Sequence, residues 1–170
     1  MASLGARDFL FREEVRKTDI DAVAQIVAAT EFFTPAETAV AVELVEERLQ
    51  KGKASGYLFL FAEHLSGLVT GYTCYGPVPA TQSTYDLYWI AVHPESQRTG
   101  LGRELLLRTE AAVVALGGMD LYIETSSRAL YQPTQSFYTR AGYCLAAEFP
   151  DFYAPGDGKL VYVKRLRRTG

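Results

Sequence analysis

The stretch WIAVHPESQRTGLGRELL, Trp89–Leu106, carries most of the information about the fold. An apolar segment is followed by a polar loop and then by an amphipathic segment, which predicts a strand, a loop and a helix. The first turn of a helix leaves backbone N–H groups without partners, and its dipole favours a negative charge there. Gly100 and Gly102 have no side chains, so an anion could approach the backbone closely. Two glycines can also form a simple tight turn, which is the plain alternative.

Two familiar kinds of phosphate loop do not fit this segment. A dinucleotide fingerprint needs three glycines, and a Walker loop needs Gly-Lys followed by Ser or Thr. The loop instead reads QRTGLG, Gln97–Gly102, and is preceded by VHPE, Val92–Glu95. Arg98 and Arg103 add positive charge beside the glycines.

Apolar periodicity and turn residues place other elements on both sides of this stretch. Strands are predicted at Phe9–Val15, Tyr57–Glu63, Leu68–Tyr75, Thr84–Val92, Met119–Ser126, Tyr143–Tyr153 and Lys159–Leu166. Helices are predicted at Thr18–Thr30, Thr34–Gly52, Gly100–Gly117 and Pro133–Gly142. The order β-α-α-β-β-β-α-β-α-β-β favours one α/β domain, residues 1–170, with a mixed sheet.

Local signals support the helices. Thr34 is the expected N-cap of the second helix, because Pro35 follows it and Glu37 stands three residues after it. Thr18 or Asp19 is the expected cap of the first helix. The apolar positions of the third helix include Leu101, Leu105, Val113 and Leu116.

Composition limits the function classes. The net charge is −3, so the total charge gives no support for a nucleic-acid partner. The basic end, Lys164–Gly170, is interpreted as a solvated terminus rather than a binding arm. Cys74 and Cys144 lie in apolar surroundings and are expected to be buried reduced thiols. The chain has no CxxC or HExxH motif, and its first residues contain no long apolar run before their charges. We therefore expect no signal peptide, no membrane span and no metal, in a cytoplasmic protein.

Two motifs together resemble a known superfamily. VHPESQRTGLG, Val92–Gly102, is similar to the acyl-CoA-binding motif of the GNAT superfamily of N-acetyltransferases, Gln/Arg-x-x-Gly-x-Gly/Ala after a strand. FYTRAGY, Phe137–Tyr143, resembles its second signature, an aromatic-Tyr helix followed by Gly-Phe/Tyr. Similarity is strong from Asp86 to Tyr143. It implies a GNAT-like domain, with a mixed, mostly antiparallel sheet of about seven strands, about four flanking helices, and a splay between strands four and five.

The resemblance implies acetyl-CoA as cosubstrate and a set of contacts for it. The backbone of Ile90, Ala91 and Val92 would pair with the pantetheine arm, and an N–H near Ala91 or Val92 would polarise the thioester carbonyl. The residues expected at the pyrophosphate are Gln97, Arg98, Thr99, Gly100, Leu101, Gly102 and Arg103. The sequence departs from the family where an Asn usually begins the next helix. Tyr131 or Thr134 is the candidate replacement for that contact.

The transfer needs a group that accepts a proton from the amine and one that supplies a proton to the departing thiolate. Tyr138 matches the family's tyrosine near the CoA sulfur, and the alternative is a core aromatic residue. We expect Phe137 to fill the core and leave the Tyr138 hydroxyl free. Asp86 and Glu124 resemble the base positions of two different branches of the family. Ordered water is the third possibility for the base.

The acceptor side of the site is less well defined. By resemblance, the segments that shape it are TEFFTPAETAV, Thr30–Val40, and DFYAPGDGK, Asp151–Lys159. The expected substrate-binding residues are Glu31, Phe32, Phe33, Phe152 and Tyr153. The acids that could attract a cation are Glu31, Glu37, Asp151 and Asp157. These residues are alternatively core aromatics and turn acids.

The resulting prediction is an acetyl-CoA-dependent N-acetyltransferase that acts on a primary amine of a small molecule. The alternatives are a protein N-terminal or lysine acetyltransferase and, from another class, a non-catalytic acyl-CoA-binding regulatory domain. We expect a monomer or homodimer whose partner is a small-molecule amine or a peptide, with no nucleic acid and no membrane.

Overall fold

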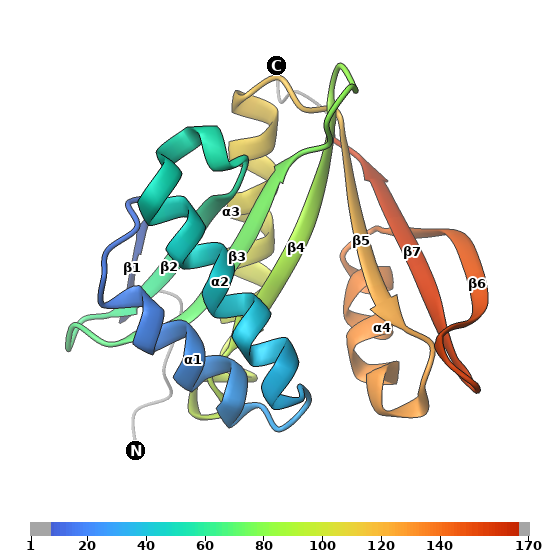
Figure 1. Ribbon diagram of the computed structural model, residues 1–170, viewed down its shortest axis with the longest axis horizontal. Coiled ribbons are helices and arrows are strands. Elements are labelled where there is room, and N and C mark those ends of the chain that lie inside the picture. The colour runs from blue at the N-terminus through green and yellow to red at the C-terminus, as the bar shows by residue number, and fades with distance from the viewer. Residues whose placement is uncertain (1–7, 167–170) are drawn as a thin grey trace. The chain divides into compact units, whose positions relative to one another are not determined.

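The computed structural model describes residues 8–166 and arranges seven strands in one sheet, in the order β1-β2-β3-β4-β5-β7-β6 (Figure 1). The strands are β1 (Phe9–Arg12), β2 (Leu58–His64), β3 (Val69–Pro77), β4 (Thr84–Val92), β5 (Asp120–Ser126), β6 (Cys144–Ala154) and β7 (Asp157–Arg165). The α-helices of this part are α1 (Asp19–Ala29), α2 (Pro35–Lys51), α3 (Leu101–Ala115) and α4 (Gln132–Arg140). The predicted order of elements and the mixed α/β fold are confirmed.

The sheet is mostly antiparallel, with one parallel pair. The pairs β1–β2, β2–β3, β5–β7 and β6–β7 are antiparallel, and β4 is parallel to β5. The parallel register covers Thr84–Leu87 and Asp120–Ile123, which are the first four residues of each strand. The splay expected beyond these residues stays a prediction.

The described residues form two compact units that interleave in sequence. Unit 1 contains the described residues up to Gly76 together with Trp89–Thr109. Unit 2 contains Pro77–Tyr88 and the described residues from Glu110 onward. β4 and α3 each contribute to both units, so the two units are not consecutive domains. A single domain over residues 1–170 remains our prediction.

The core of unit 1 has two layers of helices around its strands. Alternation along β2 turns Phe59 and Phe61 toward α1 and α2, and turns Leu60 and Ala62 toward α3. Figure 1 shows α1 and α2 on one side of β2 and β3 and α3 on the other. The Phe59 and Phe61 rings stack with centroids 5.6 Å apart. Burial of these apolar faces is the main stabilising contribution to the unit.

The first half of α3 lies close to β3 because Gly71 has no side chain. A Cβ at Gly71 would lie 3.0 Å from Leu105 Cδ1 and 3.3 Å from the Ala91 carbonyl oxygen. A second contact fixes the same pair of elements: the buried hydroxyls of Thr73 and Thr109 are hydrogen-bonded at 2.8 Å. These contacts set the position of α3, and therefore of the loop that precedes it.

The start of α2 is confirmed and the expected cap of α1 is wrong. Thr34 and Glu37 form a capping box, in which Glu37 Oε2 accepts from the Thr34 N–H at 2.7 Å. Thr18 makes no side-chain cap, because its backbone is already helical with φ −64° and ψ −18°. An N-cap side chain needs an extended backbone to turn back toward the helix.

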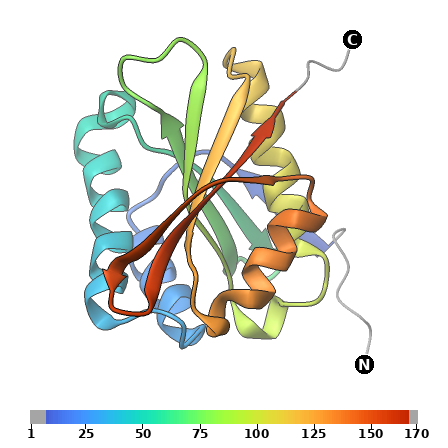
Figure 2. The same ribbon diagram turned by 90° about the vertical axis from the view of Figure 1, so that its right-hand side faces the viewer.

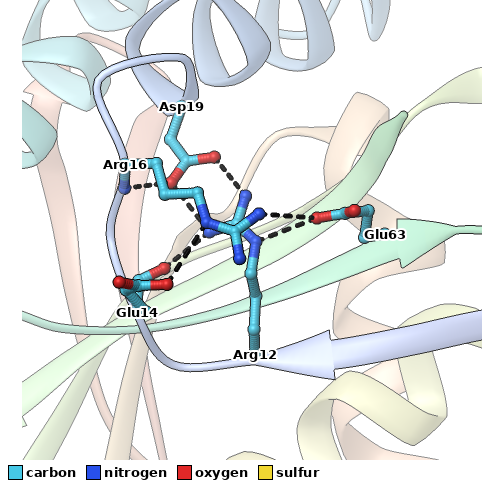
Figure 3. Close-up of polar contacts among 5 residues, drawn as sticks. All are labelled: Arg12, Glu14, Arg16, Asp19 and Glu63. Atoms are coloured by element: carbon cyan, nitrogen blue, oxygen red, sulfur yellow. Dashed lines mark hydrogen bonds and ion pairs between the residues drawn. The ribbon is translucent and has the colours of Figure 1, made fainter. Parts of the chain in front are cut away.

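Asp19 joins a buried ion-pair network instead of capping α1 (Figure 3). Its carboxylate is fully buried and accepts hydrogen bonds from the Arg12 guanidinium and from the Arg16 N–H. Arg12 Nε also bonds Glu63 Oε2 at 3.0 Å. The network ties the end of β1 to the start of α1. A buried charge that loses its partner is strongly destabilising, so the network is expected to matter for stability.

We expect Asp19→Asn to lower the free energy of unfolding by about 3 kcal/mol, because it leaves the Arg12 charge partly uncompensated. Glu14→Gln is the matched control, since Glu14 pairs with Arg16 at 3.3 Å in the same network but is 74% exposed. That exposed pair should be worth no more than about 0.5 kcal/mol. Urea unfolding of both variants checks the prediction, and equal effects would contradict a dominant role for Asp19.

In unit 2, α4 packs on the strand pair β5–β7, and the β6–β7 hairpin lies beside it (Figure 2). The Tyr138 ring of α4 lies 5.9 Å from the Tyr162 ring of β7 and 6.0 Å from the Tyr143 ring. Tyr143 donates its hydroxyl hydrogen to Glu110 Oε1 at 2.9 Å. Lys164 Nζ also reaches Glu110, at 2.8 Å. These polar groups satisfy one another beside the aromatic cluster.

Two local expectations are corrected, for Cys144 and for the end of the first strand. Cys74 is buried as expected, but Cys144 is exposed because β6 is an edge strand paired only with β7. Leu116 is 56% exposed, since α3 ends at Ala115 and its apolar stripe stops there. The first strand ends at Arg12 rather than at Val15.

No helix among residues 8–166 has the length and apolarity needed to span a bilayer. Part of the basic end, residues 167–170, lies outside the described residues.

Candidate active site

The loop between β4 and α3 has the backbone shape that its sequence predicts. A short 3-10 helix, η3 (Pro94–Ser96), follows β4, and the chain then passes through positive φ at Arg98 (61°) and Gly100 (88°). The Gly100 carbonyl accepts the first hydrogen bond of α3, from the Glu104 N–H at 3.0 Å. A Cβ at Gly100 would meet no atom within 4 Å, so the space beside this residue is open.

Side chains within the loop hold its shape and leave two amides available. Gln97 Nε2 donates to the Val92 carbonyl at 3.1 Å, and Thr99 Oγ1 donates to the Ser96 carbonyl at 2.7 Å. Thr99 Oγ1 also accepts from the Leu101 N–H at 3.4 Å. The N–H groups of Gly102 and Arg103 have no partner among residues 8–166. With Arg98 and Arg103 exposed beside them, these amides make a site suited to an anion.

Leu101 has two roles that the sequence could not separate. Its side chain is 1% exposed and belongs to the core cluster with Leu60, Ala62 and Leu105. Only its backbone faces the loop, and the Thr99 hydroxyl already engages its N–H. Its side chain therefore anchors the first turn of α3, while the amides after it remain available.

The end of β4 carries the residues expected along the pantetheine arm. Ile90, Ala91 and Val92 lie beyond the four residues of β4 that pair with β5. Ala91 is buried, while Ile90 and Val92 are partly buried against the α3 side of unit 1. These side chains anchor the strand in the core, and its backbone is the part that can contact a ligand.

Tyr138 lies in the middle of an aromatic cluster, and only 4% of its surface is exposed. The expectation that Phe137 fills the core is wrong, because Phe137 is only partly buried and Tyr138 takes the core position. The Tyr138 hydroxyl has no hydrogen-bond partner among the described residues. Burial raises the pKa of Tyr138, so the phenol stays protonated throughout the neutral pH range.

The two candidate bases differ in their surroundings. The parallel register aligns Asp86 with Tyr122, so Asp86 and Glu124 lie on the same face of neighbouring strands. Burial, and secondarily the charge of Glu124, raise the pKa of Asp86. Glu124 is 55% exposed, and its carboxylate pairs with Lys159 Nζ at 3.3 Å. Asp86 is therefore the carboxylate whose pKa is shifted toward neutral pH.

Tyr131 and Thr134 lie at the start of α4, as predicted. Tyr131 ends a 3-10 helix, η4 (Ala129–Tyr131), and is buried, with the Arg128 guanidinium 5.5 Å from its ring centroid. Thr134 is partly buried in the first turn. Their role in holding the cofactor stays a prediction.

The residues expected at the acceptor belong to two separate segments. Phe32 and Phe33 follow α1 and are partly buried, and Glu31 before them is exposed with φ 57°. Phe152 and Tyr153 lie in the irregular part of β6 and are 54% and 49% exposed. The ring centroid of Phe33 lies 4.9 Å from that of Trp89, and both side chains pack against the core of unit 1.

Most of the acids proposed to attract a cation have local structural roles. Glu37 completes the α2 capping box. Asp151 Oδ1 accepts from the Gly156 N–H at 2.7 Å in the β6–β7 turn. Asp157 accepts from Ser126 Oγ and pairs with Arg128 at 3.2 Å. The interpretation of these three as turn and capping acids therefore fits the structure better. Among residues 8–166 no group of three metal-ligating side chains is present.

The chain matches known proteins over nearly its whole length. The family model of the acetyltransferase (GNAT) domain matches residues 55–144, more than half of the chain. A solved structure from Desulfovibrio desulfuricans, described as an acetyltransferase of the GNAT family, is 46% identical, with a TM-score of 0.91 over 94% of this chain and 99% of that one. A search of curated proteins found no match.

More distant structures share the fold alone. An aminoglycoside 6'-N-acetyltransferase in complex with coenzyme A is 16% identical, with a TM-score of 0.74 over 95% of this chain and 99% of that one. The ribosomal-protein-S18-alanine N-acetyltransferase of Escherichia coli is 19% identical, with a TM-score of 0.73 over 95% and 96%. A small-molecule enzyme and a protein-modifying enzyme are therefore equally similar in fold.

Proposed function

The chain belongs to the GNAT family of acetyltransferases, and from this premise we propose that it transfers the acetyl group of acetyl-CoA to a primary amine of a small molecule. The loop before α3 is the observation that supports acetyl-CoA as the cosubstrate. Its free Gly102 and Arg103 amides, its exposed arginines and the open space at Gly100 suit a pyrophosphate. Coenzyme A in the aminoglycoside acetyltransferase complex is consistent with this choice of ligand.

The proposed reaction is a direct transfer. The neutral amine attacks the thioester carbonyl carbon, and a backbone N–H near Ala91 or Val92 stabilises the developing oxyanion. The C–S bond then breaks, and the CoA thiolate takes a proton from the Tyr138 hydroxyl. The proton lost by the amine passes to Asp86, directly or through water. Products are the N-acetylated amine and CoA.

Asp86 is proposed as the base because its environment differs from that of Glu124. A carboxylate whose pKa is raised by burial accepts a proton more readily at neutral pH than an exposed one. Glu124 is instead half-exposed and already paired with Lys159 at 3.3 Å. We therefore assign Glu124 an indirect role, through its charge on Asp86.

Asp86→Asn should change activity and stability in opposite directions. Because Asp86 has a raised pKa, its contribution to stability is complete below its ordinary pKa and is lost as the pH rises through the raised value. At pH 7 we expect the Asn variant to unfold at a higher temperature than the wild type, with the difference shrinking toward pH 4. Its kcat should fall by about 10²-fold or more.

The comparison variant is Glu124→Gln, which keeps Asp86 and removes the neighbouring negative charge. Its kcat should stay within about threefold, and the acidic limb of its pH–rate profile should move to lower pH, since a like charge raises a carboxyl pKa. Loss of activity in Glu124→Gln with full activity in Asp86→Asn would reverse the assignment.

The acceptor class is tested by offering amines and peptides in parallel. Wild-type protein with acetyl-CoA is incubated with a panel of small primary amines, and with peptides bearing a free N-terminus or a lysine. Mass spectrometry then detects a gain of one acetyl group. Acetylation of small amines supports the proposal. Acetylation of peptides alone would favour the protein-modifying alternative.

A further inference from the structure

Lys159 of β7 holds its ammonium group among two aromatic rings and a carboxylate. Its Nζ lies 4.1 Å from the centroid of the Phe152 ring and 5.2 Å from that of the Phe149 ring. The same atom donates to Glu124 Oε1 at 3.3 Å. All four residues belong to unit 2.

The strand register explains why these groups meet. Lys159 pairs with Ser126 of β5 on one side and with Phe149 of β6 on the other. Glu124 is two residues before Ser126 and so lies on the same face of the sheet as Lys159. The register of β6 shifts after Phe149, which brings Phe152 to the ammonium group as well.

The pattern of exposure is the reverse of an ordinary surface lysine. The Lys159 side chain is only 15% exposed, whereas that of Glu124 is 55% exposed. Phe149 and Phe152 are 46% and 54% exposed. Long basic side chains normally extend their charged ends into water. Here the lysine is covered, while the rings and carboxylate around it reach solvent.

Two ring faces and a carboxylate form a general recognition element for ammonium groups. We propose that Phe149, Phe152 and Glu124 form an ammonium-binding site and that Lys159 is its built-in occupant, which makes the enzyme discriminate against acceptors carrying a second ammonium group. This inference rests on the proposed function, because it concerns which amines are accepted. A dicationic acceptor must displace Lys159 or tolerate its charge, whereas a monoamine with an uncharged tail does neither.

Lys159→Met tests the proposal, because it keeps an unbranched apolar stem and removes the charge. The probe is n-butylammonium, titrated by NMR into the protein without acetyl-CoA. We expect the variant to bind the probe about tenfold more tightly than the wild type does, in keeping with the energy of a partly desolvated cation–π contact. Adding Phe152→Leu to Lys159→Met should abolish the gain, since the closest ring face is removed.

Arg165→Met is the matched control. Arg165 lies on the same face of β7 and pairs with Asp120 of β5 at 2.8 Å, as Lys159 pairs with Glu124. No aromatic ring contacts the Arg165 guanidinium within the described part of the chain. An equal gain in Arg165→Met, or no gain in Lys159→Met, would overturn the proposal.

A kinetic readout separates this inference from the proposed function. In Lys159→Met the KM for a linear diamine should fall about tenfold, while the KM for a monoamine of equal length stays unchanged. A diamine KM that does not fall would contradict the selectivity role. If the wild type acetylates no amine, the proposed function fails, and the probe titration still decides whether the ammonium site exists.

Discussion

Gly100→Asp is expected to abolish measurable binding of acetyl-CoA, with at least a 100-fold loss of affinity. The new carboxylate would stand at the start of α3, beside the free amides of Gly102 and Arg103. It would occupy the anion site and repel a pyrophosphate. Two unit charges 4 Å apart repel by about 4 kcal/mol at an effective dielectric constant of 20. Calorimetric titration with acetyl-CoA measures the loss.

Backbone strain must be separated from charge in this experiment. Gly67→Asp is the matched control, because Gly67 has φ 89° against 88° at Gly100, and a Cβ at either position meets no atom within 4 Å. Both variants therefore carry similar strain, but Gly67 lies in the β2–β3 turn, away from any helix start. Gly67→Asp should bind acetyl-CoA normally. Wild-type affinity in Gly100→Asp would refute the assignment of the loop.

Tyr138→Phe is expected to lower kcat about 100-fold and to leave the KM for acetyl-CoA within about twofold. The substitution removes only the hydroxyl that would supply a proton to the departing thiolate. Burial raises the pKa of Tyr138, which keeps the proton in place but makes full transfer costly. We therefore expect an effect near the lower end of the range for general acids. Steady-state assay of CoA release measures both constants.

Tyr162→Phe is the matched control for this substitution. Tyr162 is 6% exposed, and its ring lies 5.9 Å from that of Tyr138, in the same cluster. The Tyr162→Phe variant loses the same atom from the same aromatic cluster and should keep kcat within about threefold. Equal losses in both variants would assign Tyr138 a packing role. No loss in Tyr138→Phe would remove it from the acid role.

The helices could be predicted because their signals are local, and so could the strands, whose bounds agree to within two residues except at the end of the first strand. The capping box at Thr34 and the apolar run at Thr84–Val92 each contain their own evidence, and both are found as predicted. The glycines after β4 were also correctly interpreted as a loop before a helix. A helix or strand can be predicted from the spacing of its own apolar residues, without knowledge of distant residues.

The errors concern burial that depends on distant parts of the chain. Cys144 sits in an apolar segment, but its strand is at the sheet edge, and the position of a strand in the sheet is not encoded in that strand. Phe137 and Tyr138 are adjacent aromatics, and only the packing of α4 on Tyr143 and Tyr162 decides which is buried. Asp19 was interpreted as a cap because its partner, Arg12, lies outside the local pattern.

The acceptor side of the site was the least predictable for the same reason. Each acid in Asp151–Asp157 could bind a cation or stabilise a turn, and only the hydrogen bonds of the folded chain distinguish these roles. The sequence around Lys159 does not predict that its side chain is covered, because a lysine in a strand is common. Its covered position follows from the registers of β5–β7 and β6–β7.

Thermal unfolding with and without acetyl-CoA tests the central claim most directly. A ligand bound only by the folded protein at 100 times its Kd adds about 2.7 kcal/mol to stability. For a chain of this size we predict an increase in Tm of roughly 5–10 °C with acetyl-CoA or CoA and none with ATP at the same concentration. An unchanged Tm with acetyl-CoA, or an equal increase with ATP, would contradict the account.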